Sequence, residues 1–183
     1  MLVLITGGVR SGKSFFAEKL AHAMSDNKTY IATAVPYDEE MKNRILHHKN
    51  SRKDSGFVTI EQPYNIEEAV KNIDEKSTVL LECLGTLITN ELLKQKKDTS
   101  DNDIYKKIYD GIFKINEKVQ NLIVVSNEVF SEGKEYDEIT EKFLDIMAKT
   151  HYGIAKHADI IVECVYGLTV IIKGENLLNE VLV

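Results

Sequence analysis

The sequence has 183 residues, of which 43% are hydrophobic and 28% charged, a composition typical of a folded globular domain rather than a disordered chain. This length suits one α/β domain with a full core, so we expect residues 1–183 to form a single domain. The formal net charge of −6 disfavours a nucleic-acid partner, because such proteins normally carry a basic face. No apolar run approaches the roughly 18 residues that span a bilayer, and we expect no cleavable signal before the first strand. These features predict a cytoplasmic protein.

Short apolar runs alternate with longer amphipathic stretches along the chain. The predicted strands are Leu2–Thr6, Thr29–Thr33, Thr78–Cys83, Leu122–Ser126, Ile160–Val165 and Leu168–Lys173. The predicted helices are Lys13–Met24, Asp38–Arg52, Ile66–Ile73, Leu84–Leu93, Ile104–Val119 and Tyr136–His157. This alternation predicts a three-layer α/β fold, with a mostly parallel sheet between two layers of helices. Only Tyr166 and Gly167 separate the last two strands, which predicts an antiparallel hairpin at one edge.

Two further features concern the cysteines and one polar segment. Cys83 and Cys164 each fall within a predicted buried strand. Neither has metal-ligand spacing to another Cys or His, so we interpret both as small core residues in a reducing compartment. The polar stretch Lys94–Asp103, KQKKDTSDND, predicts a flexible loop between two helices.

A phosphate-binding motif follows the first predicted strand. The pattern G-x-x-x-x-G-K-S is matched in full by Gly7, Gly8, Val9, Arg10, Ser11, Gly12, Lys13 and Ser14. Glycines let the backbone N–H groups curl around phosphate oxygens, and the next helix adds its positive N-terminus. We expect Lys13 to reach the outer phosphates and the Ser14 hydroxyl to coordinate Mg²⁺. The alternative is a glycine-rich turn without function, but the flanking strand and helix favour a site for a purine nucleoside triphosphate.

A second acidic ligand is expected at the end of a neighbouring strand. Glu82 follows an apolar run in VLLECLGT. An acid inside a buried strand is costly unless it is paired, so we predict that Glu82 binds Mg²⁺ through water or contacts the nucleotide. The alternative is a solvent-exposed carboxylate at a strand end.

The predicted helix Asp38–Arg52 is rich in charge and contains two adjacent histidines, His47 and His48. Neighbouring residues on a helix point about 100° apart, so the two histidines cannot face one site. His48 shares a face with Arg44 and Arg52 at i, i+4 spacing. Cations beside a neutral imidazole favour the approach of phosphate, and such an imidazole can attack phosphorus. A solvated helix face with ordinary surface histidines is the other interpretation.

Several motifs occur together in an order that resembles a known family. They are TGGVRSGKS at the loop, YIATA at Tyr30–Ala34, DEEMxxRIxxHKxxR at Asp38–Arg52, LLECL at Leu80–Leu84, Thr89-Asn90, and SNEV at Ser126–Val129. This combination is similar to the bifunctional adenosylcobinamide kinase / adenosylcobinamide-phosphate guanylyltransferase family of cobalamin biosynthesis. The resemblance covers essentially the whole chain.

The resemblance implies two reactions on a corrinoid substrate. A nucleoside triphosphate, ATP or GTP, would phosphorylate adenosylcobinamide, and GTP would then guanylylate a histidine that passes GMP to the phosphorylated corrinoid. The histidine before the basic residue of the HKxxR motif corresponds to His48. The nucleotide would contact Gly7–Ser14, Ala32, Thr33 and Ala34, and the guanine nucleotide would also contact Lys49, Asn50, Ser51, Arg52, Glu61 and Glu82. The family implies a P-loop fold resembling the recombinase core and a homotrimer with sites between subunits.

The sequence departs from the family pattern after Val129, at His151-Tyr152, and at the turn Tyr166–Leu168. These positions bear on the corrinoid contacts and on the kinase step more than on guanylyl transfer. Two other functions stay open from the residues alone. A P-loop kinase without a covalent intermediate would transfer only the γ-phosphate, and a GTP-dependent switch would hydrolyse GTP slowly without a small-molecule acceptor.

Overall fold

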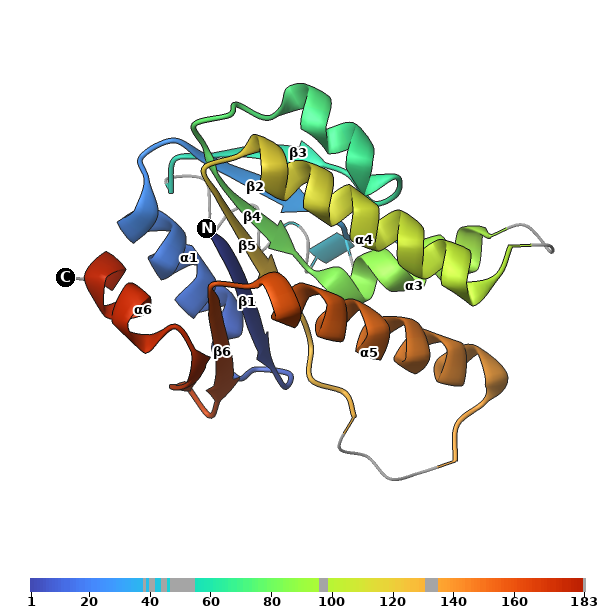
Figure 1. Cartoon of the computed structure of the whole chain (residues 1–183). Helices are drawn as coiled ribbons and strands as arrows, with labels where there is room; N and C mark the ends of the chain where they lie inside the picture. The colour runs from blue at the N-terminus through green and yellow to red at the C-terminus, as the bar shows by residue number, and fades with distance from the viewer. Residues whose placement is uncertain are drawn as a thin grey trace.

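Seven strands form one sheet in the order β3-β2-β4-β5-β1-β6-β7, in a computed structural model that describes residues 1–37, 39, 42–43, 46, 55–95, 99–130 and 135–182 (Figure 1). The strands are β1 (Leu2–Gly7), β2 (Lys28–Ala32), β3 (Phe57–Glu61), β4 (Thr78–Glu82), β5 (Asn121–Val125), β6 (Ile160–Val165) and β7 (Leu168–Lys173). The helices are α1 (Lys13–Met24), the 3₁₀ helix η1 (Ile66–Asn72), α3 (Leu84–Lys94), α4 (Asp101–Lys118), α5 (Glu138–His157) and α6 (Glu175–Leu182).

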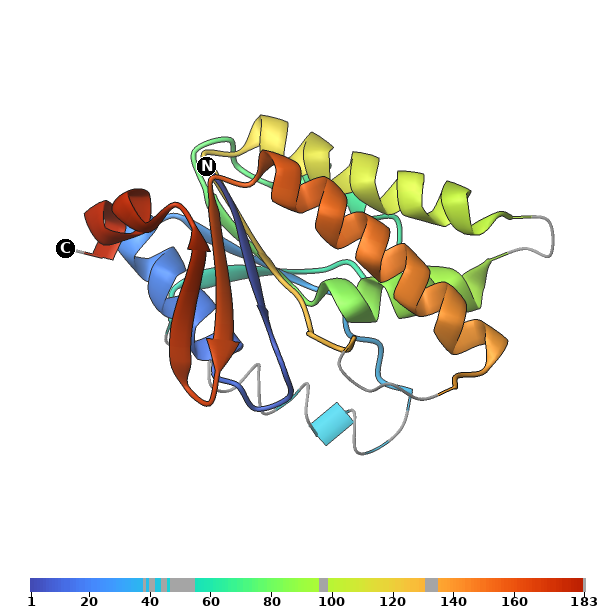
Figure 2. The ribbon, with the colours of Figure 1, turned by 60° about the horizontal axis from the view of Figure 1, so that its bottom comes forward.

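Helices cover both faces of the sheet because side chains along each strand point alternately to opposite faces. Leu2 and Leu4 of β1 belong to a buried cluster that also contains side chains of η1, α3, α4 and α5. Val3 and Ile5 belong to a second cluster that contains side chains of α1 and α6. Both faces of the central strands are therefore buried, which explains their continuous apolar runs. Figures 1 and 2 show the two layers of helices on either side of the sheet.

The pairing of the strands brings several loops to one edge of the sheet. All neighbouring strands are parallel except β6 and β7, which are antiparallel. The carboxyl ends of the parallel strands therefore meet at one edge, the lower edge in Figure 2. Ligands of open α/β sheets bind at this edge, and the predicted phosphate loop lies there at the end of β1.

The structure confirms the predicted fold class: three layers, a mostly parallel sheet and an antiparallel edge pair. The helix Lys13–Met24 and the hairpin strands Ile160–Val165 and Leu168–Lys173 have the predicted bounds. Among the described residues, no helix has both the length and the apolar character needed to cross a membrane.

Two elements were not predicted from the sequence. Strand β3 lies at the sheet edge with Val58 and Thr59 exposed, so it lacks the continuous apolar pattern of the central strands. Helix α6 is eight residues long and buries only Leu178. Both elements present too few buried side chains for a periodic pattern to indicate them.

Two local predictions need correction, and a third lies mostly outside the described residues. Cys83 is not a strand residue: it follows β4, and its sulfur accepts a hydrogen bond from the Thr86 N–H at 3.4 Å as the N-cap of α3. The segment Lys94–Asp103 is not a single loop, because α3 continues through Lys94 and α4 begins at Asp101. Ser100 and Asp103 form a capping box that fixes the start of α4. Of the predicted helix Asp38–Arg52, the structure describes only Glu39, Lys42, Asn43 and Leu46, which have helical backbone.

Candidate nucleotide-binding site

The phosphate loop depends on two glycines for its backbone path. Gly7 has φ 152 and Gly12 has φ 90, in the region that L side chains rarely adopt. A Cβ at Gly7 would lie 2.5 Å from the Cys164 carbonyl oxygen of the neighbouring strand β6. These positions therefore accept only glycine, one for close packing against β6 and the other for the turn into α1.

Most of the loop is exposed to solvent, but one of its residues is buried. Val9, Arg10 and Gly12 are exposed and Gly8 is half-buried, whereas Ser11 is 5% exposed. The Ser11 hydroxyl has no hydrogen-bond partner within the described part of the chain. The Lys13 ammonium folds back over the loop and donates to the Gly8 carbonyl oxygen at 3.0 Å. Lys13 thus places a positive charge at a solvent-exposed loop, which suits the binding of phosphate.

The predicted metal ligands, Ser14 and Glu82, are in direct contact. Although β5 lies between β1 and β4, α1 places the Ser14 hydroxyl so that it donates to Glu82 Oε1. The Tyr30 hydroxyl donates to Glu82 Oε2 at 3.0 Å. A hydroxyl and a carboxylate are the hard oxygen ligands that Mg²⁺ prefers. These residues therefore fit a Mg²⁺ ion beside the phosphate loop.

No cluster of three or more His, Cys, Asp or Glu side chains suited to a metal occurs among the residues described. Mg²⁺ commonly uses one or two protein oxygens, with phosphate oxygens and water completing its coordination. The pair Ser14 and Glu82 fits this mode of binding better than it fits a cation held by protein ligands alone.

The predicted nucleotide contacts at the ends of β2 and β3 lie in one row. Ala32 pairs in register with Glu61 on one side and with Glu82 on the other. Glu61 is exposed and Ala34 half-buried, so both border solvent at the carboxyl edge. Thr33 differs, because it is fully buried and its hydroxyl donates to the Cys83 carbonyl oxygen at 2.9 Å. Its side chain therefore joins β2 to the chain after β4.

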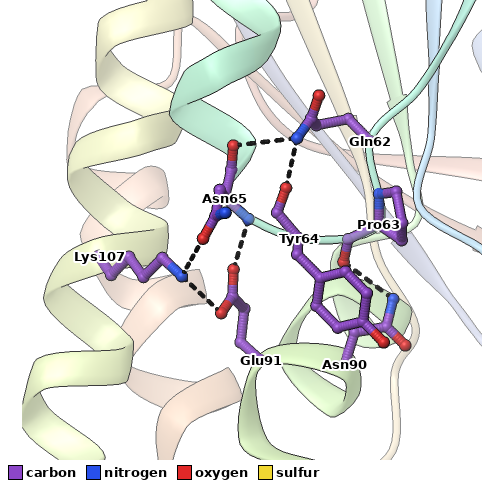
Figure 3. Close-up of polar contacts among 7 residues, drawn as sticks. All are labelled: Gln62, Pro63, Tyr64, Asn65, Asn90, Glu91 and Lys107. Carbon is purple, nitrogen blue, oxygen red and sulfur yellow. Dashed lines mark hydrogen bonds and ion pairs between the residues drawn. The ribbon is translucent and has the colours of Figure 1, made fainter. Parts of the chain in front are cut away.

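Asn90 of α3 forms hydrogen bonds with the loops that follow β2 and β3. Its amide donates to the carbonyl oxygens of Thr33 at 2.7 Å and Pro63 at 3.0 Å, and its Oδ1 accepts from the Tyr37 hydroxyl at 3.0 Å. Figure 3 shows Asn90 beneath the segment that leaves β3. These hydrogen bonds fix the chain that follows β2 to α3 as far as Tyr37.

A second polar cluster holds the segment that follows β3, at Asn65, against α4 (Figure 3). Glu91 accepts from the Asn65 N–H at 2.6 Å and forms an ion pair with Lys107 at 2.7 Å. Lys107 also donates to Asn65 Oδ1 at 2.6 Å. The left-handed backbone of Asn65, with φ 50, is thus held by two partners. Within this cluster the charges of Glu91 and Lys107 compensate each other.

The predicted nucleophile lies outside the described residues. His48, together with Lys49, Asn50, Ser51 and Arg52, belongs to residues 47–54, which the structure does not describe. Tyr37 and Ser55 are the nearest described residues of longer described segments on either side. The guanylylation site therefore stays a prediction.

Tyr30 and Ser126 lie within the family motifs and His151 at a departure from the family pattern, but sequence analysis assigned none of the three side chains a role at the site. Ser126 follows β5, and its N–H donates to the Ile5 carbonyl oxygen of β1 at 2.9 Å. His151 Nε2 lies 2.7 Å from Ser126 Oγ, so α5 is joined to this strand end. Burial lowers the pKa of His151 to about 4, while the charge of Glu128 opposes this by raising it. The imidazole is therefore neutral at pH 7. Only the strand order brings these residues near the loop.

The fold and the loop define a P-loop nucleotide-binding protein. A family model described as "Cobinamide kinase / cobinamide phosphate guanyltransferase" matches residues 3–172, and the chain belongs to this enzyme family. The resemblance identified from the motifs is thereby confirmed.

Known relatives agree with this assignment. The bifunctional adenosylcobalamin biosynthesis protein CobU of Escherichia coli K12 is 33% identical over 187 residues, which cover 94% of this chain and 100% of the relative. The corresponding protein CobP of Pseudomonas aeruginosa is 32% identical, covering 95% of this chain and 98% of the relative. Among solved structures, a prototypical ATPase from the type III secretion system of pathogenic bacteria matches with a TM-score of 0.53 and 11% identity. That match covers 99% of this chain and 60% of the other, and it supports the fold alone.

Proposed function

We propose that this chain phosphorylates adenosylcobinamide with ATP or GTP and then transfers GMP from GTP to the phosphorylated corrinoid through a guanylylated His48. The observation that carries the proposal is the contact of Ser14 with Glu82 beside the phosphate loop, in a chain whose family match spans residues 3–172. The product would be adenosylcobinamide-GDP, an intermediate of cobalamin biosynthesis.

In the kinase step, the loop amides and Lys13 hold the β- and γ-phosphates. Ser14 and Glu82 would hold Mg²⁺, which neutralises phosphate charge when it is bound. The corrinoid hydroxyl attacks the γ-phosphorus, the bond to the bridging oxygen breaks, and the nucleoside diphosphate leaves. Positioning and charge stabilisation supply most of the rate in such transfers. Ala32, Thr33, Ala34 and Glu61 lie at the edge where the nucleotide would contact the ends of β2 and β3.

In the guanylyl step, a ring nitrogen of His48 attacks the α-phosphorus of GTP and pyrophosphate leaves with its oxygen. Lys49–Arg52 would hold the guanine nucleotide. A phosphate oxygen of the corrinoid then attacks the same phosphorus, the P–N bond breaks, and His48 is regenerated. Covalent catalysis of this kind divides one difficult displacement into two.

Labelling with GTP tests the covalent step. Incubation with α-labelled GTP should leave label on the protein that acid removes and base does not, and phosphorylated cobinamide should discharge it. His48→Ala should abolish labelling, whereas the matched control His47→Ala should retain it. Normal labelling of His48→Ala would reject His48 as nucleophile. Transfer of γ-label alone would support a kinase without a covalent intermediate, and slow hydrolysis without any acceptor would support a GTP-dependent switch.

We also propose that the enzyme works in the cytoplasm, where nucleoside triphosphates are available, and that it forms a homotrimer. The family resemblance is the basis for the trimer. Light scattering of the purified chain tests it, and a monomeric mass at micromolar concentration would reject it.

A further inference from the structure

The chain that follows β5 lies beside the phosphate loop. Strand β5 pairs with β1 on one side and with β4 on the other, so its carboxyl end lies between the loop and the end of β4. The Ser126 N–H donates to the Ile5 carbonyl oxygen at 2.9 Å. Two residues later, the Glu128 N–H donates to the Gly7 carbonyl oxygen at 3.0 Å. The residue between them, Asn127, is therefore fixed at the edge of the sheet where ligands of such folds bind.

The Asn127 side chain is half-buried and reaches toward the chain that follows β4. Its Nδ2 lies 3.6 Å from the position that a Cβ on Gly85 would take. The amides of two buried asparagines, Asn90 and Asn121, donate to oxygens of the protein at 2.7 Å and 3.0 Å. By contrast, the Asn127 amide has no hydrogen-bond partner among the residues that the structure describes. Its two N–H donors and its carbonyl oxygen are therefore available to a ligand.

A nucleotide bound as proposed above would pass over Asn127. Its outer phosphates would occupy the loop at the end of β1, and its guanosine would reach the ends of β2 and β3, where Ala32 and Glu61 are paired in register. The sheet order places β5 and β4 between these two regions. Because the α-phosphate joins the outer phosphates to the guanosine, it would lie over the ends of β5 and β4. His48 belongs to the chain between β2 and β3, so it would reach the α-phosphorus from that side.

We propose that Asn127 donates a hydrogen bond from Nδ2 to a non-bridging oxygen of the α-phosphate and stabilises the transition state of guanylyl transfer. This inference rests on the proposed function, because it requires GTP in the loop and a histidine that accepts GMP. In the first transfer, the unprotonated nitrogen of His48 bonds to the α-phosphorus as pyrophosphate leaves with the bridging oxygen. In the second, a phosphate oxygen of the corrinoid bonds to the same phosphorus as the P–N bond breaks.

Both transfers would use the Asn127 amide in the same way. Each displacement passes through a five-coordinate α-phosphorus that carries charge on its non-bridging oxygens. A donor that is already fixed in place stabilises such charge without reorganising during the reaction. The amide neither gains nor loses a proton in either step.

Removing the amide should slow both guanylyl transfers and spare the kinase step, which takes place at the γ-phosphorus. For Asn127→Ala, the single-turnover rates of protein–GMP formation and of its discharge by phosphorylated cobinamide should both fall roughly 100-fold. Asn127→Asp keeps the shape but replaces the donor with a negative charge, so it should be at least as slow. The rate of γ-phosphate transfer and the affinity for inorganic tripolyphosphate should stay within a few-fold of wild type in both variants.

Asn116→Ala is the matched control for these measurements. Asn116 is also half-buried, but it lies near the end of α4 that precedes β5, at the opposite edge of the sheet. This variant should match wild type in the kinase step and in both guanylyl transfers.

Sulfur substitution in GTP tests the contact at the level of one atom. Replacing either non-bridging α-oxygen with sulfur gives two diastereomers, and only one of them carries sulfur where Asn127 would donate. The ratio of their guanylylation rates should change at least about ten-fold between wild type and Asn127→Ala, since a hydrogen bond to a charged group is lost. An unchanged ratio would overturn the contact.

The outcomes distinguish this inference from the function beneath it. Equal guanylylation rates in Asn127→Ala and wild type would overturn the role of Asn127 and leave His48 as the nucleophile. An equal loss of kinase and guanylyl activity in both variants would also overturn it, because the residue would then support the loop as a whole. A wild-type chain that acquires no acid-labile label from α-labelled GTP would instead reject the proposed function itself.

Discussion

Glu82 and Glu91 are two acidic residues whose carboxylates have different kinds of partners. Glu91 is 6% exposed, and it has a cation, Lys107, together with a backbone N–H donor. Glu82 is half-buried, and its two oxygens accept from the Ser14 and Tyr30 hydroxyls. No lysine or arginine in the described ranges forms an ion pair with Glu82.

The difference separates an acid with a structural ion pair from an acid that we propose binds a cation. A buried carboxylate is stable only when its charge is compensated, and the protein itself compensates Glu91. Hydroxyl groups orient the Glu82 carboxylate but do not neutralise it, so it is suited to an added cation. The position beside Lys13 and the phosphate loop then indicates Mg²⁺ bound with a nucleotide.

The largest expected effect comes from neutralising Glu82. Glu82→Gln keeps the shape of the side chain but removes the charge that we propose binds Mg²⁺, so kcat of the kinase step should fall at least about 100-fold. The free energy of unfolding should change by less than about 1 kcal/mol, because no ion pair is lost. Steady-state kinase assays and urea denaturation measure the two quantities. Activity within a few-fold of wild type would exclude Glu82 as a metal-binding residue.

Glu91→Gln should show the opposite pattern. The variant leaves the Lys107 ammonium without its carboxylate, so we expect the free energy of unfolding to fall by about 2–3 kcal/mol. This loss lies at the lower end of the effect of breaking a buried ion pair, because Lys107 is partly exposed. The kcat per folded molecule should stay near wild type. Adding Lys107→Met should recover part of the stability, and a purely additive double variant would contradict coupling between the two side chains.

The sequence predicted the parts of this site that are local in the chain. The phosphate loop is one continuous pattern, and Glu82 stands out as an acid at the end of an apolar run. Tyr30 and His151 lie in ordinary apolar and helical patterns, and their roles depend on β2 lying beside β4 and on the contact of α5 with Ser126 after β5. A single sequence does not show strand order, which explains why the roles of these residues were not predicted. His48 and Lys49–Arg52 were predicted from spacing and resemblance, and the structure does not describe them.

A third titratable group, His151, extends the comparison to a buried base. Burial lowers its pKa to about 4, so below pH 6.5 the unfolded chain binds a proton that the folded chain does not. The contribution of neutral His151 to the free energy of unfolding is fully present above pH 6.5 and is lost as the pH falls toward 4. The loss is about 2 kcal/mol between pH 7 and pH 5.

Urea denaturation at the two pH values measures this change against His151→Gln. The other titrating groups contribute equally to both proteins, so the variant should lose less stability by about the same 2 kcal/mol. Equal losses in the two proteins would show that His151 is protonated in the folded chain at pH 5.

The smallest effect is expected from Tyr30→Phe, which tests how Glu82 is oriented. The change removes one hydroxyl donor from the carboxylate and keeps the buried ring, which is 4% exposed. One hydrogen bond to a charged group contributes about 1.5–3 kcal/mol, so the Mg²⁺ concentration for half-maximal activity should rise roughly ten-fold while kcat at saturating Mg²⁺ changes little. Tyr109→Phe on α4 removes a hydroxyl from the opposite face and serves as the control. An unchanged Mg²⁺ requirement in Tyr30→Phe would mean that Ser14 alone orients the Glu82 carboxylate. Tyr30 would then contribute to packing rather than to the metal site.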